Sequence, residues 1–110
     1  EKFWLLQNML VFVFPSISEG FGLPVVEAMH FGKPVILSTR TCLPEIGGDA
    51  AYYFNSFDAD EMQNVFYNSL QHYTIHEGQQ HKIKNRAADF SWDKAAGQYV
   101  KIYKELLGIN

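Results

Sequence analysis

The feature that most constrains the fold of this chain is an apolar run followed by a glycine-bearing loop and a helix-like segment. Residues 9–14 are continuously apolar and end at Pro15 and Ser16. Such a run is typical of a strand buried on both faces, as in a parallel sheet. Residues 18–29 then pass from two glycines into an apolar segment with Pro24 near its start, where a helix tolerates proline. This order favours an anion-binding site, because the unpaired N–H groups and the dipole of a helix N-terminus point at one place.

The pattern of the chain predicts an α/β fold. The expected elements are a helix over residues 1–8, a strand over 10–14, a helix over 23–31, a strand over 33–38, a helical turn over 43–46 and a strand over 51–54. Two strands joined by a helix form a right-handed unit in which the strands are parallel. We therefore expect a partial Rossmann-like parallel sheet of about three short strands, with flanking helices and a helical C-terminal tail.

The second half of the chain has a helical pattern. After Asp58, apolar residues recur at helical spacing, so one stripe should pack on the core, with Ser56 or Asp58 as the N-cap. Residues 74–89 are polar with a few apolar anchors, Ile83 among them, which is typical of one or two surface helices. Ser91 can cap a last helix, whose aromatic residues should lie in the core or against a further domain. If no partner covers this apolar side, it would favour self-association.

Composition limits the classes of function. The 110 residues are 47% hydrophobic and 15% aromatic, which is typical of one small globular domain. A net charge of −3 without a basic cluster argues against nucleic acid or an anionic membrane as the main partner. Cys42 is the only cysteine, so an internal disulfide is impossible, and we expect a small apolar residue in a reducing, cytoplasmic compartment. No apolar run approaches the roughly 18–20 residues of a transmembrane helix, and no signal peptide is expected.

Two glutamates bracket the predicted anion-binding turn. Glu27 is the only charged residue between positions 23 and 29, so its carboxylate should lie at the edge of the packing or face a crevice with a polar partner. Glu19 lies in the loop after the carboxyl end of the first strand, where ligands bind in open α/β sheets. Gly20 and Gly22 permit positive φ and close approach to a ligand, but the third glycine of a dinucleotide site is missing. A solvated helix residue and an ordinary loop residue remain the alternative interpretations of the two carboxylates.

Other polar residues are weaker candidates for a site. His72 and His76 lie one helical turn apart, but no carboxylate pattern supports a metal site, so both are expected to be surface residues. Glu45 is expected to have a structural role in the turn around Gly47, with contact to a nucleotide as the alternative.

Taken together, the segments around both glutamates resemble a known signature. The segments are Pro15-Ser16, Glu19-Gly20-Phe21-Gly22-Leu23-Pro24, Glu27-Ala28-Met29 and Gly32-Lys33-Pro34-Val35-Ile36. This combination resembles the donor-binding part of glycosyltransferase family 4, a group of retaining enzymes with the two-Rossmann-domain architecture called GT-B. The family motif is two glutamates separated by seven residues, which is the spacing of Glu19 and Glu27. The likeness continues through Leu43-Pro44-Glu45-Ile46, Gly48-Asp49-Ala50-Ala51, Tyr53-Phe54 and Phe90-Ser91-Trp92.

The resemblance implies that the donor is a nucleotide-diphosphate sugar and that no divalent metal or other cofactor takes part. By analogy, Glu27 would hydrogen-bond the ribose hydroxyls, because one carboxylate can accept from two vicinal hydroxyls. The backbone N–H groups of Gly22 and Leu23 would receive the diphosphate at the helix start. Helix dipoles and basic side chains would stabilise the leaving diphosphate.

The resemblance also assigns the sugar side of the site. Glu19, with Gly20 and Phe21, would contact the hydroxyls of the transferred sugar near the anomeric carbon. Glu19 is thus the candidate catalytic residue, as a positioning group rather than a nucleophile, because the leaving phosphate helps to deprotonate the acceptor in a retaining front-face transfer. A carbohydrate or lipid-linked acceptor would bind through another domain. The complete protein would be cytoplasmic or peripheral at the inner face of the membrane.

The sequence departs from the family in one respect. Full-length members carry an upstream Arg and Lys that clamp the diphosphate, and neither Lys33 nor Arg40 is a defensible substitute. The chain also begins at Glu1 rather than Met. We therefore expect residues 1–110 to be the C-terminal portion of a nucleotide-sugar-binding Rossmann-like domain. The start of that domain and the N-terminal acceptor domain would be absent, and this piece alone would be inactive.

The expected function is hexosyl transfer by a complete protein in which this chain binds the donor. The missing basic pair keeps open a different class, a catalytically inactive nucleotide-binding or interaction module. An unrelated phosphate-binding α/β domain is a third interpretation.

Overall fold

The computed structural model describes residues 1–109 and has an α/β fold. In chain order the elements are α1 (Lys2–Asn8), β1 (Phe12–Phe14), α2 (Leu23–His30), β2 (Val35–Ser38), α3 (Leu43–Gly47), the 3-10 turn η1 (Gly48–Ala50), β3 (Tyr52–Phe54), α4 (Ala59–Ile75), α5 (Gln79–Ala88) and α6 (Trp92–Leu107). The strands form one sheet in the order β1-β2-β3, with both pairs parallel. The predicted fold class and its three short parallel strands are therefore confirmed.

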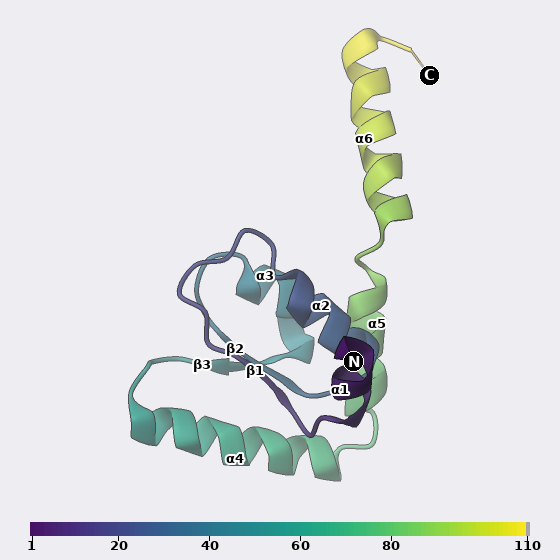
Figure 1. Cartoon of the computed structure of the whole chain (residues 1–110). Coiled ribbons are helices and arrows are strands. Elements are labelled where there is room, and N and C mark those ends of the chain that lie inside the picture. The colour runs from purple at the N-terminus through teal and green to yellow at the C-terminus, as the bar shows by residue number, and fades with distance from the viewer. Residues whose placement is uncertain (110) are drawn as a thin grey trace.

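Helices lie on both faces of this sheet (Figure 1). α2 and α3 cover one face, α5 packs on α2, and α4 runs beneath the other face, where it contacts β3. β2 is the central strand and all four of its residues are buried. Because the strands are parallel, the loops that follow β1, β2 and β3 all leave from the same edge of the sheet. That edge carries the segment with the two glutamates.

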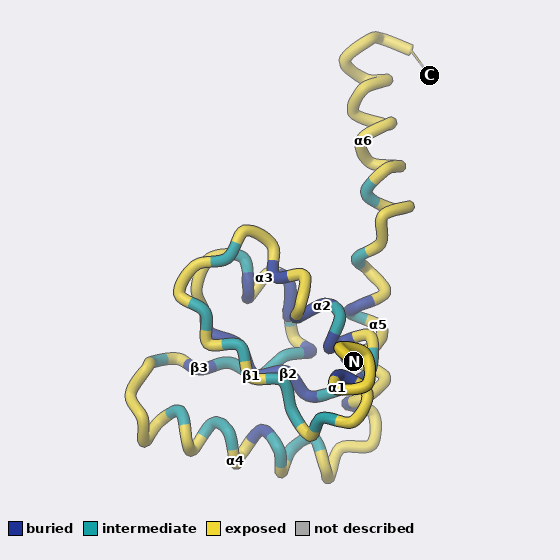
Figure 2. The backbone as a smooth tube through the Cα atoms, in the orientation of Figure 1, coloured by how far each residue is buried: buried dark blue, intermediate teal, exposed yellow. Residues whose placement is uncertain are grey.

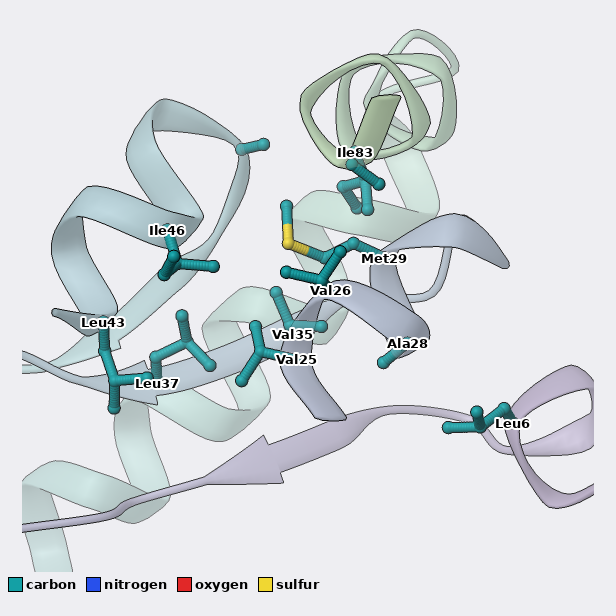
Figure 3. Packing of buried hydrophobic residues seen from close by; sticks show 12 residues of the cluster. Leu6, Val25, Val26, Ala28, Met29, Val35, Leu37, Leu43, Ile46 and Ile83 are labelled. Atoms are coloured by element: carbon teal, nitrogen blue, oxygen red, sulfur yellow. The ribbon is translucent and has the colours of Figure 1, made fainter. Parts of the chain in front are cut away.

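The hydrophobic core lies between β2 and the helices α2, α3 and α5 (Figure 3). Residues on most sides of α2 are buried, namely Val25, Val26, Ala28 and Met29. A helix that is apolar nearly all round must be covered on more than one side. The sheet covers one side, and α5 covers another with Ile83 and Ala87.

This packing agrees with the prediction for residues 74–89, a surface segment held by a few apolar anchors. α5 buries Ile83 and Ala87 completely, so one face of this polar segment belongs to the core. These two apolar residues are enough to pack α5 on α2, because they lie four positions apart and therefore on the same face of the helix. The sparse pattern therefore indicated the face of α5 that packs on the core.

The first strand is shorter and more exposed than its sequence predicts. β1 covers Phe12–Phe14, and Val13 is 40% exposed, so the expectation of a strand buried on both faces is wrong. Phe12 and Phe14 pack against the core cluster, and their rings stack on one another. Val13 therefore points to the opposite face. On that face, α4 packs chiefly on β3.

The two long C-terminal helices begin at predicted caps. Asp58 caps α4 by accepting from Glu61 N–H at 3.2 Å, and Ser91 caps α6 by accepting from Lys94 N–H at 3.0 Å. α6 nevertheless projects away from the other elements (Figures 1 and 2), and none of its residues is buried. The prediction that its aromatic residues lie in the core is wrong within residues 1–109, while contact with a further domain and self-association stay predictions. In the same range, no helix is both long enough and apolar enough to cross a membrane.

Candidate functional site

The turn between β1 and α2 is built on one glycine. Gly22 is the N-cap of α2 and has φ 89, which L side chains adopt rarely. A Cβ at this position would lie 3.2 Å from Leu43 Cδ2, so the packing of α3 against the turn also favours glycine. Gly20 differs, because its φ is not positive and a Cβ there would meet no atom within 4 Å. Of the two glycines predicted to permit positive φ, only Gly22 uses it.

The first turn of α2 offers few backbone donors. The N–H groups of Val25 and Val26 donate to Gly22 O at 3.0 and 3.4 Å, and Pro24 has no N–H. The N–H groups of Gly22 and Leu23 are thus the donors that this turn can present to an anion. Leu23 is half exposed at the surface of the turn.

Glu27 lies in α2 and has the polar partner that its apolar surroundings predicted. Lys2 Nζ of α1 lies 3.3 Å from Glu27 Oε1. The side chain of Glu27 is 28% exposed, so the carboxylate is partly enclosed but reachable from solvent. The sequence did not predict Lys2 as the partner of Glu27, because the two residues lie on different helices and no local pattern indicates their contact.

Glu19 is held at both its side chain and its backbone. Its Oε1 accepts from Ser16 Oγ at 3.0 Å, and its N–H donates to Thr41 Oγ1 at 3.2 Å. Cys42 Sγ lies 3.2 Å from Phe21 O and 3.6 Å from Glu19 O. The loop after β1 is thereby fastened to the loop after β2. Neither Thr41 nor Cys42 was a predicted site residue, because both contacts depend on strands that bring the two loops together.

Phe21 connects the same loop to α5. Its ring meets the Phe90 ring edge to face at 5.8 Å, and the Arg86 guanidinium lies 4.8 Å from the Phe90 ring centroid. Arg86 Nε also donates to Ile46 O at 3.0 Å, and its other donors bond Glu45 O and the Asp89 carboxylate. Arg86 thus satisfies carbonyl groups at the end of α3. Glu45 takes part in this contact through its backbone.

His72 is half-buried, whereas His76 is exposed as the sequence suggested. His72 Nδ1 lies 2.7 Å from Tyr52 Oη, and the His72 ring stacks on His76 with the centroids 3.8 Å apart. Burial raises the pKa of Tyr52 to about 12, and the nearby Tyr73 adds to this effect. Within residues 1–109, no three His, Cys, Asp or Glu side chains are grouped so that they could hold a metal ion.

The chain matches known proteins over most of its length. Residues 3–89 match the family described as glycosyl transferases group 1. The chain is 40% identical over 95 residues to O-antigen chain mannosyltransferase B of Escherichia coli, covering 86% of this chain and 25% of that protein. It is 34% identical over 107 residues to MMP alpha-(1->4)-mannosyltransferase of Mycolicibacterium hassiacum, covering 94% of this chain and 26% of that protein.

A solved structure has the same arrangement of elements. Sucrose-phosphate synthase from Thermosynechococcus elongatus superposes with a TM-score of 0.78 at 26% sequence identity, covering 96% of this chain and 28% of that protein. This chain therefore spans about a quarter of the length of the relatives described.

Proposed function

The chain belongs to the glycosyl transferases group 1 family, and from this premise we propose that it is the donor-binding part of a larger retaining glycosyltransferase. The observation that carries the proposal is the arrangement around the start of α2. Glu19 lies just before the turn at Gly22 and Glu27 lies within the helix, so two carboxylates flank a helix N-terminus. Carboxylates accept from hydroxyl groups and helix N-termini attract phosphate, so a molecule with hydroxyls on both sides of a diphosphate matches this order.

The ribose, the diphosphate and the sugar of the donor each have a counterpart in this proposal. Glu27 accepts hydrogen bonds from the ribose hydroxyls, and Lys2 holds its carboxylate in place at 3.3 Å. The N–H groups of Gly22 and Leu23 receive the diphosphate. Glu19 accepts from hydroxyls of the sugar near the anomeric carbon, and its bond from Ser16 fixes one carboxylate oxygen. With the carboxylate in this role, the leaving phosphate takes the acceptor proton and the configuration is retained.

The names of the relatives extend the proposal to the sugar. Both curated relatives described above are mannosyltransferases, so we take mannose as the transferred sugar. The acceptor is a carbohydrate or a lipid-linked carbohydrate bound by a further domain, and the reaction takes place in the cytoplasm or at the inner face of the membrane. It needs no metal or other cofactor, so chelators should leave the rate unchanged.

Sugar transfer by the protein that contains this chain tests the proposal, with GDP-mannose and UDP-glucose as donors. Glu27→Gln should raise the donor Kd about tenfold or more, because a hydrogen bond to a charged group contributes about 1.5–3 kcal/mol. Glu19→Gln should mainly lower kcat. Glu77→Gln, an exposed carboxylate in the turn before α5, is the matched control and should change neither quantity.

One further readout decides whether the reaction is retaining. The anomeric configuration of the product, followed by NMR, should equal that of the donor. Unchanged donor affinity and unchanged kcat in both glutamate variants would contradict the proposal. Nucleoside diphosphate binding without transfer to any acceptor would favour the inactive nucleotide-binding module.

A further inference from the structure

Thr41 has an unusual backbone conformation. Its φ is 50, and it is the only residue other than glycine with positive φ among residues 1–109. For a β-branched residue this region of backbone conformation is a true outlier and is strained. A strained residue persists only where surrounding contacts hold it in place. The contacts of Thr41 therefore indicate what the strain maintains.

The side chain of Thr41 makes a hydrogen bond to a residue of the candidate site. Its Oγ1 accepts from the N–H of Glu19 at 3.2 Å, across 22 positions of the chain. The carboxylate of Glu19 separately accepts from Ser16 Oγ. Thr41, in the loop after β2, thus holds the backbone of Glu19, and Ser16, in the loop after β1, holds its side chain.

Two neighbours of Thr41 reinforce the same connection. Ser38, at the end of β2, is 1% exposed and donates its hydroxyl to Ser16 O. Cys42 lies with its Sγ 3.2 Å from Phe21 O. Together with Thr41, these side chains attach the loop after β1 at its beginning, middle and end. Gly20 lies within that loop, and without the connection its backbone would be free to move.

We propose that Thr41 is a positioning residue for Glu19, and that its hydroxyl sets the place of the Glu19 backbone at the donor sugar. This inference rests on the proposed function, because Glu19 matters only if it contacts the sugar. Its effect should fall on turnover rather than on donor affinity. Glu27 and the N-terminus of α2 bind the nucleotide and do not depend on Thr41. In contrast, a shift of about 1 Å in a group that positions the reacting atoms can lower the rate up to a hundredfold.

The test compares Thr41→Val, which removes the hydroxyl at nearly constant shape, with Thr41→Ser, which keeps it. Thr41→Val should lower kcat about tenfold or more with the donor KM changed less than about threefold. Thr41→Ser should restore most of the turnover. The amide hydrogen of Glu19 should exchange faster in the valine variant, because it has lost its acceptor.

A glycine variant separates positioning from folding. Thr41→Gly relieves the strain at φ 50, so it should unfold at the same or a higher urea concentration than the wild type, and yet it should lose turnover as Thr41→Val does. Equal turnover in the valine, glycine and wild-type proteins would overturn the inference, as would unchanged exchange of the Glu19 amide.

The Glu19→Gln variant distinguishes this failure from failure of the proposed function. If Glu19→Gln lowers kcat and Thr41→Val does not, Glu19 keeps its role and only the positioning by Thr41 is wrong. If Glu19→Gln leaves kcat unchanged, the role of Glu19 in the proposed function fails, and positioning for turnover fails with it. The exchange rate of the Glu19 amide still decides whether Thr41 holds that backbone.

Discussion

Lys2 Nζ and Glu27 Oε1 lie 3.3 Å apart and join α1 to α2 across 25 positions of the chain. The Lys2 side chain is 63% exposed, so solvent screens the pair. An ion pair of this kind stabilises a fold by at most about 1 kcal/mol. The contact therefore matters more for where the carboxylate points than for the stability of the protein.

The first prediction separates the contribution of Glu27 to stability from its contribution to nucleotide binding. Glu27→Gln should change the free energy of unfolding by less than about 1 kcal/mol, because the pair is exposed. Titration calorimetry with GDP and UDP should show much weaker binding to the same variant. Lys2→Met serves as the control: it should match Glu27→Gln in urea denaturation but lose less affinity. A loss of several kcal/mol of stability in Glu27→Gln would show that the carboxylate is structural.

The second prediction concerns the turn at Gly22. Gly22→Ala should lower the free energy of unfolding by about 1–2 kcal/mol, because alanine is strained at positive φ and its Cβ would press on Leu43. Gly20→Ala is the matched control in the same loop and should change stability by less than about 0.5 kcal/mol. Urea denaturation of both variants measures the difference. Equal stability of the two would mean that the turn does not require glycine.

The third prediction tests whether α5 belongs to the core. Ile83 is 0% exposed, whereas Ile75 at the end of α4 is 66% exposed. Ile83→Ala should destabilise the fold by about 2–5 kcal/mol, because it leaves a cavity against α2. Ile75→Ala removes the same atoms and should lower stability by less than about 1 kcal/mol. Thermal and urea unfolding would contradict the packing of α5 if both variants behaved alike.

The fourth prediction concerns alkaline pH. Burial first, and Tyr73 second, raise the pKa of Tyr52 from 10.0 to about 12. The folded protein therefore keeps the Tyr52 proton between these values while the unfolded chain loses it. The corresponding stability is complete below pH 10 and is lost as the pH rises toward 12.

Tyr52→Phe should make this fall in stability shallower, because phenylalanine carries no proton to lose. At neutral pH the same variant should be less stable by about 1 kcal/mol, since it lacks the hydrogen bond to His72. Urea denaturation at neutral pH and at several values between pH 10 and 12 measures both effects. Tyr67→Phe, at an exposed position on α4, is the control and should leave the fall in stability with pH as it is in the wild type.

The sequence predicted the order and type of the elements well, because their signals are local. A buried β-branched run became β2. The N-cap of α4 is Asp58, one of its two predicted candidates, and the N-cap of α6 is the predicted Ser91. Gly22 and Pro24 lie at the start of α2, as the turn chemistry required. Each of these features depends on contacts between residues a few positions apart.

Burial was predicted less well, because it depends on what lies opposite a residue. The apolar run of β1 leaves Val13 exposed, since α4 packs on β3 instead. Ile83 of α5 is the exception, because it was a predicted anchor and does lie in the core. The apolar side of α6 is exposed, although apolar residues gathered on one side of a helix usually face a core.

By itself, therefore, the sequence determined the parallel α/β fold, the order of its elements, the family motif and the two candidate carboxylates. Only the tertiary structure decided what holds those carboxylates. Lys2 reaches Glu27 and Thr41 reaches Glu19 from segments 25 and 22 positions away. The physical reason is that capping and periodicity act along the chain, whereas these partners meet only after the sheet and its helices have packed.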